Sequence, residues 1–249
     1  MSPFQYALQL LTRFPVVSAD VKIDDDDYKV AATQALYYLP LVGLMIGGLL
    51  LLIYMIMIWF GFAQMVVAAL LVVALAAITG ALHLDGLADS ADAWLGGFGD
   101  KDKTLAIMKD PYSGPAGVVA LVSVLLIKFS ALYTLVSNGE VLWLVFAPVI
   151  ARALAMLLFA ETPYVRSGGM GEAFSDPKHK RVILMQLAGI AVLALLIMGW
   201  QSVWVMAMVL SVTYGARALM IQRIGGTTGD TAGALIEVLE CVVLVVAVA

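Results

Sequence analysis

The sequence predicts an all-α fold: a polytopic membrane helical bundle of about seven transmembrane helices, with an interfacial helix at the amino terminus. Composition is the first reason, because 63% of the 249 residues are apolar and 13% are charged, about half of the roughly 25% that is usual in proteins. The second reason is that the apolar residues form continuous runs, whereas an outer-membrane β-barrel alternates apolar and polar positions. The net charge of −4 argues against a nucleic-acid binder that relies on a basic face.

Seven apolar runs are long enough to cross a bilayer as helices, which satisfy their own backbone hydrogen bonds there. They cover residues 35–60, 64–82, 116–137, 141–160, 182–200, 203–221 and 232–249. We expect residues 1–249 to form one integral membrane domain. Gly43, Gly47 and Gly48 in the first run predict close helix packing, because small residues let two backbones approach.

The residues before the first run predict a short helix on the membrane surface. Phe4, Ala7, Leu8 and Leu11 recur at intervals of three and four, which places them on one helical face. The acidic stretch 24–27 is expected to be a solvated loop, with metal binding as the alternative.

The distribution of lysine and arginine predicts the orientation of the bundle. If the runs alternate in direction, every cation outside them falls on one side: Arg13, Lys22, Lys29, Lys101, Lys103, Lys109, Arg166, Lys178, Lys180, Arg181 and Arg223. Cationic loops stay on the cytoplasmic side. We therefore expect a multi-pass membrane protein with its amino terminus and its chemistry on the cytoplasmic side. Lys128, Arg152 and Arg217 lie within runs, and the role of Lys128 stays open.

Residues 80–94, at the end of the second run, carry the strongest local pattern. Asp85, Asp89 and Asp92 stand at positions i, i+4 and i+7, so on a helix they lie within about 60° of one another. Three carboxylates on one face repel each other, and a bound cation compensates this most simply. Carboxylate oxygens suit Mg²⁺ or Mn²⁺. The alternative is a solvated acidic helix end.

A glycine- and threonine-rich turn precedes the last run. Its residues Thr227, Thr228 and Gly229 are expected to offer amides and hydroxyls to a phosphate at the amino end of a helix.

Two further acids follow this turn on one helical face. Asp230 and Glu237 are candidates to complete the metal site, since Glu237 stands in apolar surroundings where a bare charge is costly. The alternative for Glu237 is a structural pair with Arg152 or Arg217.

Three other side chains are candidates for contact with a reacting phosphate. Lys109 lies in a loop rich in glycine and proline, which is otherwise only a turn. Arg152 is an intramembrane cation that would pair with a phosphate or with Glu237. His83 adjoins the Asp face and is a candidate base, or else a histidine that anchors its helix at the interface.

Cations held by carboxylates beside a glycine- and threonine-rich loop indicate phosphoryl or nucleotidyl transfer. The segment that begins at Asp85 partly resembles the Asp-Gly-x-x-Ala-Arg signature of the CDP-alcohol phosphotransferases, but Asp89 replaces the arginine. A cation-coupled transporter also uses intramembrane carboxylates. It would need polar access from both sides, whereas the external side offers only Glu140 as a charged group.

A closer resemblance, over nearly the whole chain, is to the cobalamin synthase (adenosylcobinamide-GDP ribazoletransferase) family. The matching stretches are residues 11–16, 38–43, 83–92, 107–110 and 225–240. The third, His-Leu-Asp-Gly-Leu-Ala-Asp-Ser-Ala-Asp, and the fifth are highly specific. Residues 111–115, Pro-Tyr-Ser-Gly-Pro, depart from the Ser-Arg-x-Gly-Thr that family members often have there, so substrate contacts of that loop are not carried over.

The resemblance implies an Mg²⁺-dependent transferase of cobalamin biosynthesis that joins adenosylcobinamide-GDP to α-ribazole or its 5′-phosphate and releases GMP. Two ions, with Mn²⁺ as a substitute, would be held by Asp85, Asp89 and Asp92, completed by Asp230 or Glu237. Lys109 and Arg152 would stabilise phosphate charge, and His83 would be the base. The partners implied are the two substrates and the lipid bilayer, without nucleic acid, and the resemblance leaves room for a homo-oligomer or a complex with other corrinoid-pathway enzymes.

Overall fold

The computed structural model describes residues 2–13, 25–166, 171, 174 and 180–249. The described residues form helices and no β-strand, apart from one isolated bridge between Tyr164 and Thr227. The elements are α1 (Pro3–Leu11), α2 (Asp25–Ala35), the 3-10 turn η1 (Leu36–Tyr38), α3 (Leu39–Trp59), α4 (Gln64–Thr79), α5 (Leu82–Gly96), α6 (Lys101–Ile107), α7 (Pro115–Asn138), α8 (Trp143–Glu161), α9 (Lys180–Met198), α10 (Gln201–Ile224) and α11 (Gly229–Val246). The predicted all-α bundle is confirmed.

Most of the predicted spans coincide with long apolar helices. Among the described residues, five helical segments are long and apolar enough to cross a membrane, or six when the bent pair α4 and α5 is taken as one span. The run 232–249 corresponds to α11, which contains the three acids Asp230, Glu237 and Glu240. These charges set α11 apart from the other long helices, and the seventh span stays a prediction.

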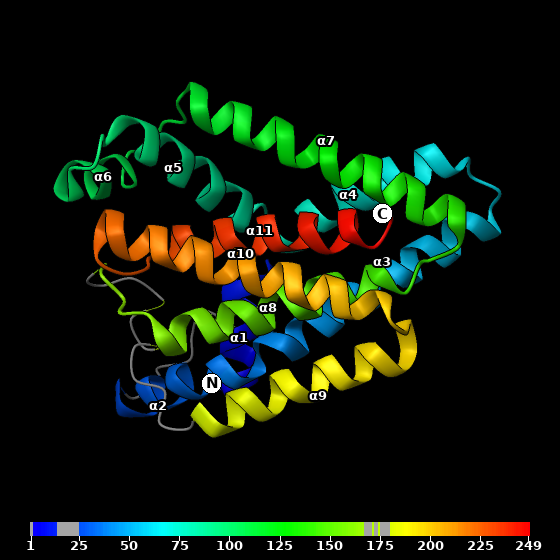
Figure 1. Ribbon diagram of the computed structural model, residues 1–249, viewed down its shortest axis with the longest axis horizontal. Coiled ribbons are helices and arrows are strands. Elements are labelled where there is room, and N and C mark those ends of the chain that lie inside the picture. The colour runs from blue at the N-terminus through cyan, green and yellow to red at the C-terminus, as the bar shows by residue number, and fades with distance from the viewer. Residues whose placement is uncertain (1, 14–24, 167–170, 172–173, 175–179) are drawn as a thin grey trace.

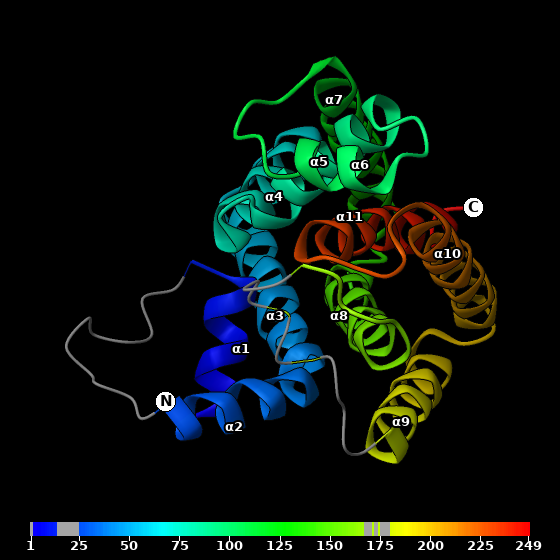
Figure 2. The ribbon, with the colours of Figure 1, turned by 90° about the vertical axis from the view of Figure 1, so that its left-hand side faces the viewer.

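The bundle has one end where the connecting segments that carry cations gather. Figure 1 shows α2, α6, the carboxyl ends of α5 and α10, and the start of α7 together at the left, while the opposite end has short turns. Viewed from that end in Figure 2, α8 lies in the middle, with α3, α9, α10 and α11 around it. The long helices alternate in direction along the chain, which is the condition under which the cations outside the runs fall on one side.

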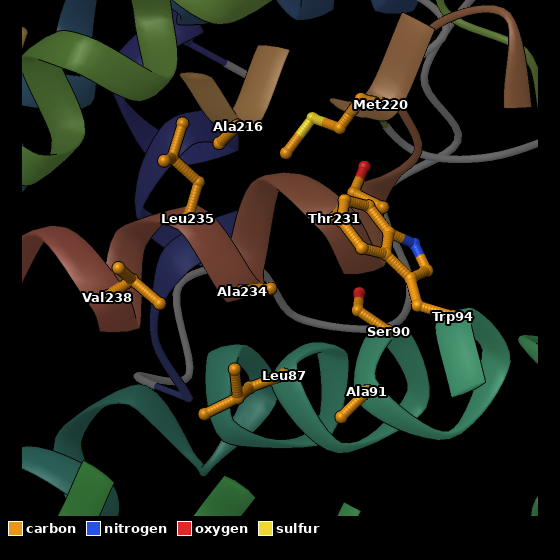
Figure 3. Close-up of a pocket in the computed structure, with 10 residues that line it drawn as sticks. All are labelled: Leu87, Ser90, Ala91, Trp94, Ala216, Met220, Thr231, Ala234, Leu235 and Val238. Carbon is orange, nitrogen blue, oxygen red and sulfur yellow. The ribbon is translucent and has the colours of Figure 1, made fainter. Parts of the chain in front are cut away.

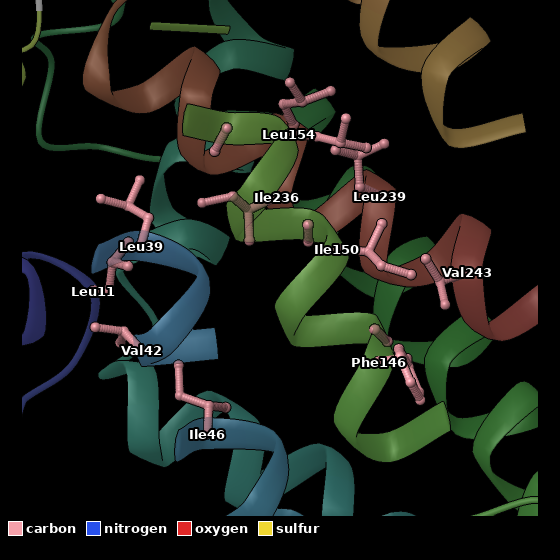
Figure 4. Packing of buried hydrophobic residues seen from close by; sticks show 14 of the residues in the cluster. Leu11, Leu39, Val42, Ile46, Phe146, Ile150, Leu154, Ile236, Leu239 and Val243 are labelled. Carbon is pink, nitrogen blue, oxygen red and sulfur yellow. The ribbon is translucent and has the colours of Figure 1, made fainter. Parts of the chain in front are cut away.

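The helices α8 and α11 form the centre of the core. Almost every side chain of α8 is buried, whereas large apolar side chains of α3, α7, α9 and α10 are exposed on the outside of the bundle. Such a wide apolar exterior fits a lipid solvent. Figure 4 shows Ile150 and Leu154 of α8 beside Ile236 and Leu239 of α11.

The second predicted run does not continue straight into the aspartate segment. Gly80 and Ala81 both have positive φ values, and α4 and α5 meet at 89°. A Cβ on Gly80 would overlap the side chain of Arg13, which packs over this turn. The amide of Arg13 also donates to the carbonyl of Ile78. The bend redirects α5 and ties it to the end of α1.

The amino-terminal region forms the predicted short helix and differs from expectation in the acidic stretch. The helix α1 has a capping box between Ser2 and Gln5, and its apolar face packs on the protein: Ala7, Leu8 and Leu11 are buried, and α1 contacts α2 and α3. The acidic stretch expected as a loop contains the start of α2, which begins at Asp25. Asp24 lies outside the described residues.

The glycines of α3 let it cross α8 at close range. A Cβ on Gly43 would lie 2.5 Å from the carbonyl oxygen of Pro148, and one on Gly47 would lie 2.6 Å from the Cα of Val145. A Cβ on Gly48 would have no described neighbour within 4 Å. The predicted close packing is confirmed for the first two glycines and not for the third.

This crossing gives a matched stability prediction. Gly43→Ala forces a methyl group into the Pro148 backbone, so we expect it to lower the free energy of unfolding by about 1–3 kcal/mol. Gly48→Ala faces open space and is expected to be neutral or stabilising by up to about 1 kcal/mol, since alanine favours a helix. Thermal unfolding in detergent measures both. Equal effects of the two variants would contradict the crossing.

Candidate functional site

The site is built where α5 crosses α11 with their backbones nearly touching. A Cβ on Gly86 would lie 2.7 Å from the carbonyl oxygen of Asp230, and one on Gly233 would lie 3.3 Å from the Cα of His83. The Asp-Gly pair at residues 85 and 86 therefore has a steric reason. Only glycine lets the two helices approach so closely that carboxylates from both stand side by side.

A cavity of about 390 Å³ opens beside this crossing. Asp85 from α5 and Asp230 from α11 both line it. Asp89, one helical turn beyond Asp85, is half-buried and lies within electrostatic range of both carboxylates. Two of the five predicted metal ligands, Asp85 and Asp230, thus share the cavity, whereas Asp89 is not among its described lining residues and reaches them only electrostatically. The mutual repulsion of these carboxylates makes this a region suited to a cation.

Arg166 supplies the positive charge of the cavity. It donates to the Asp230 carboxylate at 2.6 Å, and both side chains keep part of their surface accessible. Arg166 therefore keeps part of its guanidinium accessible and can still reach an anion in the cavity. In the sequence, Arg166 is one of the cations outside the apolar runs, and nothing in its local pattern distinguishes it from the others.

A backbone contact between two loops positions Arg166. The amide of Thr227 donates to the carbonyl of Pro163 at 2.8 Å, and the amide of Val165 donates to the carbonyl of Thr227 at 2.9 Å. A Cβ on Gly226 would overlap the carbonyl of Pro163. These contacts fasten residues 163–166 to the start of α11, which carries Tyr164 and Arg166 to the cavity.

The hydroxyls of Thr227 and Thr228, which were predicted to bind a phosphate, form hydrogen bonds within the turn. Thr228 is the N-cap of α11, its side chain accepts from the amide of Thr231, and the Thr227 and Thr231 hydroxyls lie 3.0 Å apart. Both Thr227 and Thr228 are fully buried. Gly229 alone of the three predicted residues lines the cavity. The threonines shape the turn, and the glycine presents its backbone to the cavity.

The third aspartate of α5 reaches a different neighbour. The two carboxylate oxygens of Asp92 accept hydrogen bonds from the amides of Gly114 and Gly117, at 2.6 and 2.9 Å. These amides belong to the first turn of α7, where they have no helical partner. Asp92 therefore fastens the start of α7 to α5, and the described lining of the cavity does not include it.

Glu237 and Arg152 belong to a buried ion-pair network. Lys128 of α7 donates to Glu237 at 2.7 Å and to Glu240 at 2.5 Å, and Arg152 of α8 donates to the other oxygen of Glu240. All four side chains are at most 3% exposed. The role of Lys128, which the sequence left open, is therefore to form buried ion pairs within the protein. The described cavity lining includes none of the four.

His83 and Lys109 have contrasting surroundings. His83 lines the cavity, is buried, and neither ring nitrogen has a hydrogen-bond partner among the described residues. A buried imidazole with both nitrogens unused has room to bind a substrate group or water. Lys109 follows α6 and is exposed, and the described residues that line the cavity do not include it.

A second, apolar pocket of about 200 Å³ lies on the other faces of α5 and α11, against α10. Figure 3 shows Leu87, Ala91 and Trp94 of α5 opposite Leu235 of α11. Its described lining contains no charged residue. The two cavities therefore differ in chemistry, and only the larger one combines carboxylates with an arginine.

The carboxylates fit magnesium when a substrate supplies further ligands. No group of three or more His, Cys, Asp or Glu side chains among the described residues is gathered tightly enough to hold an ion alone. Mg²⁺ is usually held by one or two carboxylates together with waters and substrate phosphates. Asp85, Asp89 and Asp230 offer such hard oxygen ligands beside the cavity.

Apolar helices around a charged cavity at one end of the bundle define a polytopic membrane protein with a candidate active site for an anionic substrate. The chain belongs to the family described as cobalamin-5-phosphate synthase, which matches residues 3–248. The resemblance predicted from the motifs is confirmed.

Curated relatives cover almost the whole chain. Proteins named adenosylcobinamide-GDP ribazoletransferase are 49% identical in Pseudomonas putida strain W619 (98% of this chain and 97% of the relative) and 46% identical in Pseudomonas entomophila strain L48 (98% of each chain). One from Ectopseudomonas mendocina strain ymp is 46% identical over 96% of this chain and 95% of its own. No solved structure matches the chain.

Proposed function

We propose that this protein is an adenosylcobinamide-GDP ribazoletransferase whose reaction takes place in the cavity beside the crossing of α5 and α11. The 3′-hydroxyl of α-ribazole, or of its 5′-phosphate, attacks the phosphorus attached to the aminopropanol arm. A new P–O bond forms, the phosphoanhydride bond breaks, and GMP leaves. The observation that carries the proposal is the meeting of Asp85, Asp230 and Arg166 in one cavity of a chain with such relatives.

The side chains that line the cavity have three different roles in this proposal: phosphate binding, proton acceptance and hydrogen-bond donation. Arg166, already oriented by Asp230, donates to phosphate oxygens of the diphosphate. The neutral imidazole of His83 takes the proton of the attacking hydroxyl. Burial raises the pKa of the Tyr164 hydroxyl above its ordinary value, so Tyr164 stays protonated and can donate a hydrogen bond to substrate.

Asp85, Asp89 and Asp230 would hold Mg²⁺ together with the substrate phosphates. Such an ion lowers the pKa of a bound hydroxyl and neutralises charge on a leaving phosphate. Asp92, Glu237 and Arg152 are assigned structural roles in this proposal, because the first is bonded to α7 and the others to a buried network. Lys109 would act only on the outer part of the substrate.

We further propose that the end of the bundle that carries the cavity faces the cytoplasm of a bacterial inner membrane. Cations in the described segments at that end, such as Lys101, Lys103 and Arg223, support this orientation through the retention of positive loops. The diphosphate of adenosylcobinamide-GDP is charged and would cross a bilayer only at high cost, and a cytoplasmic cavity spares it that crossing.

Purified protein in detergent or liposomes, given Mg²⁺, adenosylcobinamide-GDP and α-ribazole 5′-phosphate, tests the function. The expected products are a corrinoid with a closed nucleotide loop and GMP in equal amounts. Parallel reactions with unphosphorylated α-ribazole identify the preferred acceptor, and EDTA followed by fresh Mg²⁺ tests the metal. A folded protein that yields neither product with either acceptor would refute the proposal.

Arg166→Ala is expected to lower kcat/KM by about 100-fold, the effect of removing one donor to developing charge. Arg166→Lys should recover only part of it, because an ammonium cannot bridge Asp230 and a phosphate in a fixed planar geometry. Steady-state kinetics measure both variants. Arg181→Ala on α9, also an exposed cation at the same end, is the control and should keep wild-type rates. If both alanine variants lose activity equally, the loss reflects general charge instead of the cavity.

A further inference from the structure

We propose that the cavity encloses the small acceptor, with its benzimidazole-type base against an apolar wall made by α1, α3 and α8, while the larger substrate reaches it only with its diphosphate. This inference rests on the proposed function and deepens it. The polar wall of the cavity comes from α5, α11 and residues 163–166. The apolar wall consists of Leu10, Leu11, Leu39 and Phe159.

The volume decides which substrate enters. A cavity of about 390 Å³ lies near the lower end of the roughly 300–1,000 Å³ of pockets that enclose drug-sized ligands. A nucleoside or its phosphate has this size. Adenosylcobinamide-GDP carries a corrin ring, an adenosyl group and a guanosine diphosphate, and is several times larger. It can therefore present only its diphosphate to the cavity mouth while the acceptor is enclosed.

The lining matches the two halves of an α-ribazole. The base is an uncharged bicyclic aromatic group, which gains by leaving water, whereas the ribose hydroxyls need polar partners. Leu11 and Leu39 lie together across from Ile236 of α11 (Figure 4), and all three line the cavity. A guanine against this apolar wall would leave its several donors and acceptors unpaired.

An aromatic pair stands at the border between the two walls. The rings of Phe159 and Tyr164 have centroids 6.3 Å apart, and both residues line the cavity. Aromatic side chains at this spacing offer edge and face contacts to a third ring. A base held there points its ribose toward His83 and Asp85, which is the direction that the reaction requires.

Helix α1 has a role in specificity for the acceptor in this proposal. Leu10 and Leu11 are contributed by the amino-terminal helix, whose end is tied to the bend before α5 through Arg13 and Gly80. The helix that the composition placed on the membrane surface therefore forms part of the acceptor site. The apolar pocket of Figure 3 is a poorer place for the base, because it lies on the faces of α5 and α11 turned away from Asp85.

Leu10→Asn tests the apolar wall. The half-buried Leu10 becomes polar, so we expect the KM for α-ribazole 5′-phosphate to rise about 10-fold or more while the KM for adenosylcobinamide-GDP is unchanged. Leu10→Met conserves volume and should stay within about 2-fold of wild type. Leu95→Asn, at an exposed leucine of α5 outside the cavity, is the matched control.

A measurement on the wild-type protein keeps the test independent of folding. Free 5,6-dimethylbenzimidazole should inhibit competitively against α-ribazole 5′-phosphate and not against adenosylcobinamide-GDP. Inhibition competitive with the corrinoid, or a Trp94→Ala variant that raises the acceptor KM while Leu10→Asn does not, would overturn the inference in favour of another location. Absence of product from the wild-type protein would instead refute the proposed function, so the two failures are distinguishable.

Discussion

Asp89→Asn is expected to lower kcat by about 10²- to 10³-fold while leaving the fold intact. The substitution keeps the size of the side chain and removes a charge that lies within electrostatic range of Asp85 and Asp230. In the proposed function these carboxylates hold Mg²⁺, and the loss of one electrostatic contact that stabilises the transition state has an effect of this size. The Mg²⁺ concentration needed for half-maximal rate should rise in parallel.

Asp102→Asn on α6 is the control, since Asp102 is exposed at the same end of the bundle and belongs to a different helix. It should keep wild-type kinetics. Thermal unfolding in detergent checks that both variants are folded. Unchanged turnover and unchanged Mg²⁺ dependence in folded Asp89→Asn protein would show that the metal proposal is wrong.

The second large effect concerns stability and involves the buried network. Among the described residues, Glu240 is the carboxylate that pairs with both Lys128 and Arg152, so Glu240→Met leaves the buried Arg152 without its ion-pair partner. Breaking a buried ion pair by removing one partner typically costs about 3–5 kcal/mol. We expect a correspondingly lower melting temperature in detergent.

A double variant separates ion pairing from packing. Arg152→Met combined with Glu240→Met replaces both partners with apolar side chains and keeps the Lys128–Glu237 pair, so it should regain most of the lost stability. Glu140→Met in the turn between α7 and α8 should change stability by less than about 0.5 kcal/mol. A double variant as unstable as Glu240→Met would contradict the ion-pair explanation.

Much of the fold was predictable from the sequence because lipid imposes a simple rule on apolar runs. Helix α3 and helices α7 to α10 stand close to their predicted ranges. The bend at Gly80 and Ala81 was not predicted, since a single glycine in an apolar run does not reveal a left-handed turn. The central position of α11 was also missed, because its acids are paired by cations that lie far away in the sequence.

The site was predictable where its residues share one helix. The spacing of Asp85 and Asp89 indicates that the two side chains share one helical face. Where α5 and α11 cross, each helix has a glycine, Gly86 and Gly233. Arg166 was out of reach, because only the contact between residues 163–166 and Thr227 brings it to Asp230. The sequence predicted Glu237 as a metal ligand or as a structural partner of Arg152 or Arg217. Its partner in the structure is Lys128.

The buried network also bears on how the chain is assembled in the membrane. With Asp230, Glu237 and Glu240, α11 is a poor candidate to enter a bilayer alone, since each central carboxylate is costly there. Lys128 and Arg152 stand 109 and 88 residues ahead of their partners, so they leave the ribosome first. The acids of α11 therefore find their partners only when α7 and α8 are already in place. Insertion of α11 thus depends on correct insertion of the helices made before it.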